Sequence, residues 1–231
     1  MKALFRNQIW HLLAIFCLIV GLQFLVTHFK LIADGALWGL KTQIWFWLAV
    51  LIPILHQIYV WLVWRLELYQ KTFTSRYGLS RAFRGYSIGF SLLFVGSLIM
   101  IILLAISDPN TLPIHAWLAT LIAVIITIPV IYLFYSVKKY FTMERAFGMD
   151  HFDWNYNKKF ERRGIFQYTS NGMYIFGLMI LYLPGLLFLS QLALIVALYN
   201  HLYIWVHYYC TELPDMKVIY GQAEFTTLTE P

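Results

Sequence analysis

Residues 173–209 read MYIFGLMILYLPGLLFLSQLALIVALYNHLYIWVHYY, and this long apolar run decides the fold class. The run is long enough for two helices of roughly 17 to 20 residues, the length that crosses a bilayer. The segment Leu183-Pro184-Gly185 interrupts it, and adjacent proline and glycine residues break helices and mark turns. The run therefore predicts a helical hairpin embedded in a membrane.

Four more apolar runs of spanning length precede the hairpin, at residues 9–29, 44–64, 88–106 and 114–137. The chain is 61% hydrophobic and only 12% charged, whereas soluble domains are about 25% charged. We expect an all-α integral membrane protein with four transmembrane helices and a C-terminal helical hairpin. We expect one membrane domain, with an N-terminal four-span region at 1–137 and a C-terminal region at 138–231.

The basic residues indicate the orientation, because short loops rich in Lys and Arg stay in the cytoplasm. The loop after the first expected span and the loop after the third hold only Lys30 and Lys41. Apart from Lys217 in the tail, the other basic residues precede the first span or follow the second and fourth: Lys2, Arg6, Arg65, Lys71, Arg76, Arg81, Arg84, Lys138, Lys139, Arg145, Lys158, Lys159, Arg162 and Arg163. We expect both termini and residues 138–172 to be cytoplasmic. The net charge of +6 then favours anionic lipid headgroups as partners, and not nucleic acid.

Two polar clusters bracket the predicted hairpin. The first, residues 164–174, reads GIFQYTSNGMY, and the second, residues 211–221, reads TELPDMKVIYG. Folding the hairpin brings its two ends to the same membrane surface. We therefore expect a site made from both clusters.

In order and spacing, GIFQYTSNGMY and ELPDMKVIYG resemble motifs of membrane-embedded methyltransferases, which include phosphatidylethanolamine N-methyltransferases and isoprenylcysteine carboxyl methyltransferases. The upstream stretch ERAFGMDHF is also similar, so the resemblance covers about residues 138–225. Two features depart from the family pattern. Ser170-Asn171-Gly172 stands where the family has Arg-His-Pro or Arg-Asn-Pro, and Leu213 stands where it has a second glutamate. Arg162 or Arg163 could replace the missing arginine.

The resemblance implies methyl transfer from S-adenosylmethionine to a membrane lipid substrate, with a phospholipid amine headgroup as the preferred acceptor. It also implies that residues 138–231 form a methyltransferase-like catalytic region with a cytosolic cofactor-binding segment. The sulfonium cation of this cofactor favours aromatic ring faces, which tyrosines supply. Glycines allow the ligand to approach the backbone, and a helix start leaves N–H groups free for a carboxylate. The cofactor-binding residues that we expect are Tyr168, Asn171, Gly172, Tyr174, Gly177, His207, Tyr209 and Glu212.

The expected catalytic residues are Glu212 and Asp215. An ethanolamine headgroup arrives as an ammonium and must lose a proton before it attacks, and a buried carboxylate with a raised pKa can accept that proton. We assign this step to Glu212, with Asp215 as support one helical turn away. No metal site is expected, because His201 and His207 do not have the i, i+4 spacing that binds zinc.

Three alternatives stay open. Isoprenylcysteine carboxyl groups or small thiols are acceptors within the same family. GIFQYTSNGMYIFG also resembles a segment of the NADPH-dependent steroid 5-alpha-reductases. The 2′-phosphate of NADPH could then bind to the basic residues Lys158, Lys159, Arg162 and Arg163. However, Leu178 stands where those enzymes have an acidic residue. The third is a non-catalytic membrane protein, in which the tyrosines form an interfacial belt and Glu212 and Asp215 belong to a solvated tail.

Overall fold

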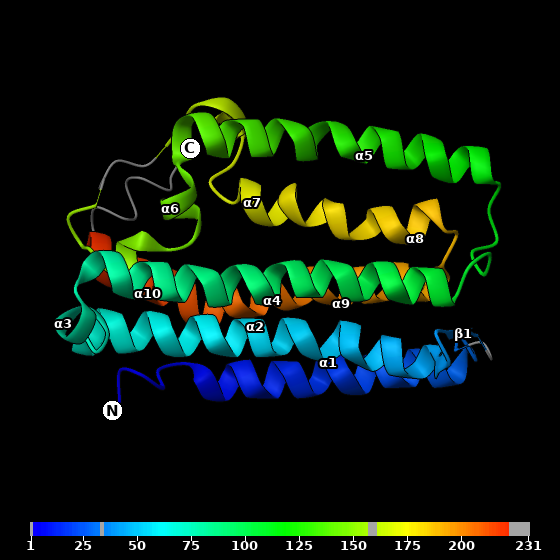
Figure 1. Cartoon of the computed structure of the whole chain (residues 1–231), viewed down its shortest axis with the longest axis horizontal. Coiled ribbons are helices and arrows are strands. Elements are labelled where there is room, and N and C mark those ends of the chain that lie inside the picture. The colour runs from blue at the N-terminus through cyan, green and yellow to red at the C-terminus, as the bar shows by residue number, and fades with distance from the viewer. Residues whose placement is uncertain (1, 33–34, 157–160, 222–231) are drawn as a thin grey trace.

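The computed structural model describes residues 2–32, 35–156 and 161–221, and it is mostly helical (Figure 1). It contains four helices that are long and apolar enough to cross a membrane. They are α1 (Gln8–His28), α2 (Thr42–Gln70), α4 (Leu79–Ser107) and a continuous Ala116–Phe141 helix that joins α5 (Ala116–Ser136) to the π-helical turn η1 (Val137–Phe141). Each expected span falls on one of these helices. The structure thus agrees with the predicted all-α membrane class.

The remaining elements are short. A two-stranded antiparallel hairpin, β1 (Ala36–Leu37) and β2 (Leu40–Lys41), precedes α2, and α3 (Thr74–Tyr77) joins α2 to α4. After η1 come α6 (Met143–Ala146), η2 (Met149–His151), η3 (Gly164–Gln167), α7 (Gly172–Ile175), η4 (Gly177–Tyr182), α8 (Leu183–Leu187), α9 (Gln191–His207), the π-helical turn η5 (Tyr208–Glu212) and α10 (Leu213–Tyr220).

The apolar run at 173–209 turns at a different place from the one that the sequence predicts. Pro184 lies in the first turn of α8, where its missing N–H group costs nothing, and the chain continues as a helix to Leu187. The reversal follows at Leu189, whose φ of 54° is left-handed, and the Ser190 hydroxyl then caps α9. Gly185 serves the packing of the two arms, because a Cβ there would lie 2.7 Å from Leu194 Cγ.

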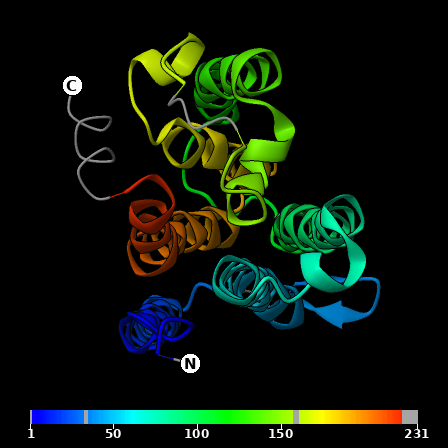
Figure 2. The same cartoon turned by 90° about the vertical axis from the view of Figure 1, so that its left-hand side faces the viewer.

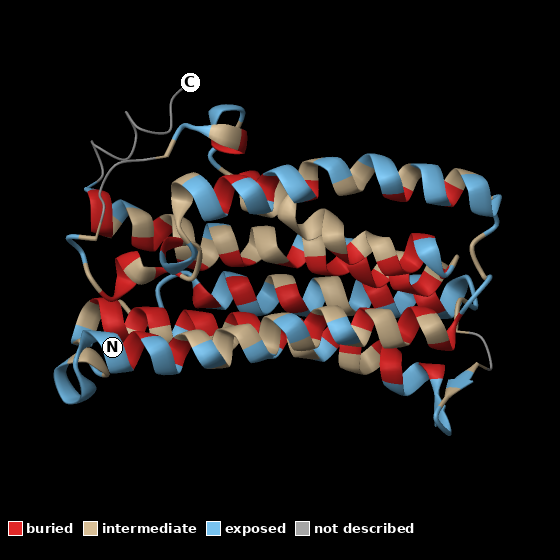
Figure 3. Ribbon diagram, turned by 45° about the horizontal axis from the view of Figure 1, so that its top comes forward, coloured by how far each residue is buried: buried red, intermediate tan, exposed pale blue. Residues whose placement is uncertain are grey.

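Helix α9 forms the centre of the bundle. It packs against α1, α2, α4, α8 and η4, while α5 covers η4 and α8 on the outer side (Figures 1 and 2). Its core-facing residues are fully buried and include Ala193 and Ala197, whose small side chains let neighbouring helices approach. Apolar residues such as Phe16 on α1 and Ile128 on α5 are exposed, which suits lipid contact. Exposed positions recur along the outer helices of the bundle (Figure 3).

Residues 138–148 read KKYFTMERAFG, a stretch that predicts a helical continuation of α5 with Gly148 as its C-cap. In the structure the helix continues only to Phe141 and breaks at Thr142, whose φ is 77°. A new short helix, α6, starts there, with the Thr142 hydroxyl accepting a hydrogen bond from the Arg145 N–H. Residues 142–152 thereby cross the end of the bundle that also carries α3 and α10, opposite β1 (Figure 1).

Candidate functional site

Two adjoining cavities lie at this end of the bundle. The first, which we call the polar pocket, has a volume of 90 Å³ and is lined by Trp64, Phe141, Arg145, Ala146, Gly148, Asp150, Glu161, Phe166, Ser170, Asn171, Met173, Tyr174, Tyr208, Glu212, Met216 and Tyr220. The second, the apolar cavity, has a volume of 210 Å³ and extends between α2, α4, α5, η4 and α9. Trp64, Ala146, Met173 and Tyr174 line both and form the wall between them.

Tyr174 and Glu212 connect the two polar clusters of the sequence. The Tyr174 hydroxyl donates a hydrogen bond to Glu212 Oε2, although 38 positions separate the two residues. The chain reversal between α8 and α9 places α7 beside the end of α9, where the Tyr174 ring meets the rings of Trp205 at 5.9 Å and Tyr208 at 5.6 Å. The hairpin therefore brings its two ends together at the wall between the cavities.

Glu212 has an unusual carboxyl group. It ends the π-helical turn η5, and such turns inside α-helices often occur at functional sites because they redirect side chains. Burial, followed by the nearby negative charges of Asp215 and Asp150, raises the pKa of Glu212 to about 8. The carboxyl group can therefore accept or hold a proton near neutral pH.

Asp215 points away from the polar pocket. Both of its carboxylate oxygens lie 3.2 Å from Arg65 Nε, and both side chains are fully buried. Arg65 also donates to the backbone oxygens of Leu4 at 3.0 Å, Arg6 at 2.6 Å and Cys210 at 3.1 Å. Asp215 thus connects α10 to α2 and to the N-terminal segment and does not line the polar pocket, while its negative charge still acts on Glu212.

A polar triad that the sequence analysis did not single out lines the other side of the polar pocket. Arg145 Nε lies 3.4 Å from Asp150 Oδ2, and the Tyr220 hydroxyl lies 2.8 Å both from Arg145 Nη2 and from Asp150 Oδ2. In the sequence Arg145 appears only as one basic residue among many near a span end. Its position becomes apparent only when α6 folds over the bundle end and meets α10.

The other predicted cofactor residues fall into three groups. Asn171 lines the polar pocket, whereas Gly177 and His207 line the apolar cavity. The side chains of Tyr168 and Tyr209 are 72% and 59% exposed and line neither space.

The predicted residues Gly172 and Gly177 are both closely packed against neighbouring side chains. A Cβ on Gly172 would lie 3.3 Å from Ile165 Cγ2, and one on Gly177 would lie 2.8 Å from Leu133 Cδ2.

Arg162 and Arg163, two of the basic residues expected to replace the missing arginine or to bind a 2′-phosphate, do not line the polar pocket. Arg163 pairs with Glu161 at 2.8 Å and its side chain is 69% exposed, and Arg162 is exposed. Lys158 and Lys159 lie outside the described residues. Within the part of the chain that the structure describes, no group of three or more His, Cys, Asp or Glu side chains could hold a metal ion.

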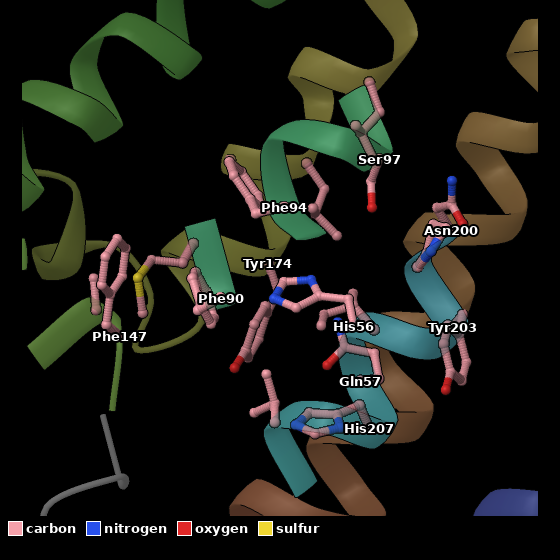
Figure 4. A pocket seen from close by; sticks show the side chains of 18 of the residues that line it. His56, Gln57, Phe90, Phe94, Ser97, Phe147, Tyr174, Asn200, Tyr203 and His207 are labelled. Carbon is pink, nitrogen blue, oxygen red and sulfur yellow. The ribbon is translucent and has the colours of Figure 1, made fainter. Parts of the chain in front are cut away.

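The sequence analysis did not identify four of the polar side chains in the apolar cavity. His56 and Gln57 project from α2, and Asn200 and Tyr203 project from α9 beside the predicted His207 (Figure 4). In the sequence they lie within long apolar runs, which is typical of a helix contact. The signal that could have found them is a polar residue in the middle of a predicted span.

Comparisons with known proteins place these features in no family: no family model, curated protein or solved structure matches the chain. The function must therefore be argued from the site.

Proposed function

We propose that this protein is an integral membrane methyltransferase that moves a methyl group from S-adenosylmethionine to an acceptor dissolved in the bilayer. The observation that carries the proposal is the Tyr174–Glu212 hydrogen bond, which lies where a polar pocket meets an apolar cavity. A reaction between a water-soluble donor and a lipid-soluble acceptor needs such a junction. The motif resemblance, which covers the same two residues, supports the choice of methyl transfer.

The polar pocket has the donor set that this cofactor requires. Arg145 provides a cation for the carboxylate of the cofactor, and Glu212 and Asp150 provide acceptors for its ammonium and ribose hydroxyls. The Tyr174 and Tyr208 rings are available to the sulfonium, at about 0.5 to 2 kcal/mol for each contact of this type. When bound there, S-adenosylmethionine would supply an electrophilic methyl group.

Glu212 provides the proton acceptor that an amine substrate needs. The ammonium first gives a proton to Glu212, whose raised pKa suits proton transfer near neutral pH. The nitrogen lone pair that this frees could then bond to the methyl carbon that bound S-adenosylmethionine would supply, with the electrons of the carbon–sulfur bond staying on sulfur and S-adenosylhomocysteine leaving. Tyr174 holds the carboxylate in place through its hydroxyl. A phospholipid ethanolamine is the first acceptor to test, with prenylated cysteine and small thiols next.

The reductase alternative has less support. Leu178, which stands at the position of that family's acidic residue, lines the apolar cavity, and the exposed Arg163 is paired with Glu161. A non-catalytic protein would have little reason to keep a carboxyl group of raised pKa facing a pocket, because burying it costs stability.

The test is transfer of a labelled methyl group from S-adenosylmethionine to lipids, with the protein in nanodiscs that contain phosphatidylethanolamine. We expect labelled lipid from the native protein and at least about a hundredfold less from Glu212→Gln, since a positioned general base contributes about 10² to 10⁴ in rate. Glu144→Gln is the matched control, because Glu144 is exposed in α6 and lines neither cavity. Undiminished transfer by Glu212→Gln would remove Glu212 from the mechanism.

A further inference from the structure

The lining of the apolar cavity carries no formal charge. Among the described residues that line it there is no Asp, Glu, Lys or Arg, whereas the polar pocket next to it holds Arg145, Asp150, Glu161 and Glu212. A phosphate or ammonium in the apolar cavity would therefore lose its hydration without gaining a counter-ion, which costs several kcal/mol. The charged part of any ligand must remain in the polar pocket.

The apolar cavity is long and lies parallel to the helices. Along α2 its lining extends from Pro53 to Trp64, which at 1.5 Å per residue corresponds to about 16 Å. Phe134 and Met143 line the cavity and are also 44% and 45% exposed at the protein surface. A hydrocarbon chain or ring can therefore enter from the bilayer near these two residues and extend toward the middle of the membrane.

Polar side chains at the inner end of this cavity lack partners. The amide of Asn200 donates from Nδ2 to the Ala49 oxygen at 3.5 Å, but its Oδ1 accepts no hydrogen bond from any described residue. His56 Nε2 also makes no hydrogen bond with any described residue, and neither does the side chain of Gln57. These side chains come from α2 and α9 and project into the same space (Figure 4).

The unpaired atoms define the kind of group that fits. An amide oxygen only accepts hydrogen bonds, so its missing partner is an O–H or N–H donor. The unpaired ring nitrogen of His56 can donate or accept, depending on the tautomer. A hydroxyl group can donate to Asn200 Oδ1 and also exchange a hydrogen bond with a neighbour. A ketone or ether oxygen would leave Asn200 Oδ1 unsatisfied, at a cost that buried polar groups usually avoid.

We infer that the apolar cavity binds an uncharged lipophile that carries a hydroxyl group, recognised by Asn200, His56 and Gln57. The further statement that this lipophile is the membrane-embedded part of the methyl acceptor rests on the proposed function. In that arrangement the hydroxyl lies near the middle of the membrane, and the group that receives the methyl lies at the Tyr174–Glu212 end.

The binding claim can be tested with two probes, 4-nonylphenol and 4-nonylanisole, in which methylation of the phenol oxygen removes the hydrogen-bond donor. Saturable binding of each labelled probe to the full chain in nanodiscs is measured above that of empty nanodiscs. We expect the phenol to bind at least about fivefold more tightly than the anisole, as one additional hydrogen bond allows. Equal affinities, or no saturable binding of either probe, would overturn the inference.

Variants locate the site. Asn200→Leu should remove the preference for the phenol, and Leu198→Ala on the same helix should retain it, because Leu198 is 50% exposed and lines neither cavity. If Asn200→Leu fails to fold, Gln57→Met provides a second test of the site. This variant should fold, since no hydrogen bond within the described chain depends on the Gln57 amide. A preference for the phenol that survives in both variants would contradict the assigned site.

Failure of this inference and failure of the proposed function can be told apart. Binding of S-adenosylhomocysteine with no preference between the probes would overturn the cavity assignment and leave methyl transfer standing. A preference for the phenol without any binding of S-adenosylhomocysteine would support the cavity assignment and overturn the proposed function.

Discussion

At the residue scale, Glu212 and Asp215 show how two neighbouring carboxyl groups acquire different roles. Glu212 faces the polar pocket and is held by the Tyr174 hydroxyl, so it remains available to a ligand. Asp215 is fully buried and pairs with Arg65. Burial raises the pKa of Asp215 to about 6, against the opposing effect of Arg65, so it is less perturbed than Glu212 at about 8. Asp215, which contacts the Arg65 cation, is the structural carboxyl group, and Glu212 is the candidate base.

The pH dependence of turnover follows from Glu212. A general base acts only when deprotonated, so kcat/KM should rise with pH up to about 8, the pKa of Glu212, and level off above it. Methyl transfer measured between pH 6 and 9 checks this. Glu144→Gln should keep the same acidic limb, whereas an acidic limb unchanged in the residual activity of Glu212→Gln would assign the titration to another group.

Arg65 should matter for stability. Arg65→Met leaves Asp215 buried without its cation, and breaking a buried ion pair in this way costs about 3 to 5 kcal/mol. Unfolding of the variant in lipid–detergent mixtures measures the loss. Arg84→Met is the control, because Arg84 is exposed on α4 and should change the unfolding free energy little. A loss as small as that of the control would mean that the pair does not hold α10 in place.

At the element scale, the polar pocket depends on the segment between α5 and η2. This segment reverses at Thr142 and Gly148, both of which have positive φ values, and His151 then stacks on Trp64 at a ring distance of 4.0 Å. Gly148 lies directly against the Trp64 ring, so even a methyl group there would overlap it. The turns at Thr142 and Gly148 therefore place Arg145 in α6 and Asp150 in η2 beside α10.

Gly148→Ala should destabilise the protein and weaken cofactor binding together. The substitution strains a backbone with a φ of 85° and also places a Cβ against Trp64. Gly39→Ala, in the turn between β1 and β2, is the control, because its φ of 77° is also positive but nothing lies within 4 Å of its Cβ. Thermal unfolding and calorimetry on both variants check the difference. Equal losses would show that the contact with Trp64 is unimportant.

The sequence predicts these elements unevenly, for physical reasons. Long apolar runs predict the spanning helices well, because the bilayer fixes the length of a span. The break at Thr142 and the π-helical turn η5 leave no comparable pattern, since tertiary contacts at the bundle end determine them. In the candidate site, motif spacing anticipates the approach of Tyr174 to Glu212. Motif spacing does not identify Arg145, and it places Asp215 in the candidate site. The partners of both side chains depend on how α6 and α10 pack, which motif spacing does not reveal.

At the scale of the whole molecule, both cavities lie toward the end of the bundle that carries most of the basic residues. The loops after α2 and α5 are at that end, and the β1–β2 hairpin is at the other (Figure 1). If the basic end is cytoplasmic, as the distribution of Lys and Arg predicts, the polar pocket opens toward the compartment that supplies S-adenosylmethionine.

The orientation can be tested with single cysteines in a chain whose native thiols, Cys17 and Cys210, are replaced by serine. Ser75→Cys in α3 and Ala36→Cys in β1 are both exposed and lie at opposite ends of the bundle. A membrane-impermeant maleimide should label Ala36→Cys in intact cells and label Ser75→Cys only after permeabilisation. The reverse pattern would place the polar pocket on the wrong side of the membrane for the proposed reaction.

The measurement that tests the central claim most directly is calorimetric binding of S-adenosylhomocysteine and of NADPH, in parallel, to the purified protein. The account predicts micromolar binding of S-adenosylhomocysteine that Glu212→Ala abolishes and Glu144→Ala preserves, and no binding of NADPH. Binding of NADPH alone would contradict methyl transfer and favour a reductase, and binding of neither molecule would favour a non-catalytic protein.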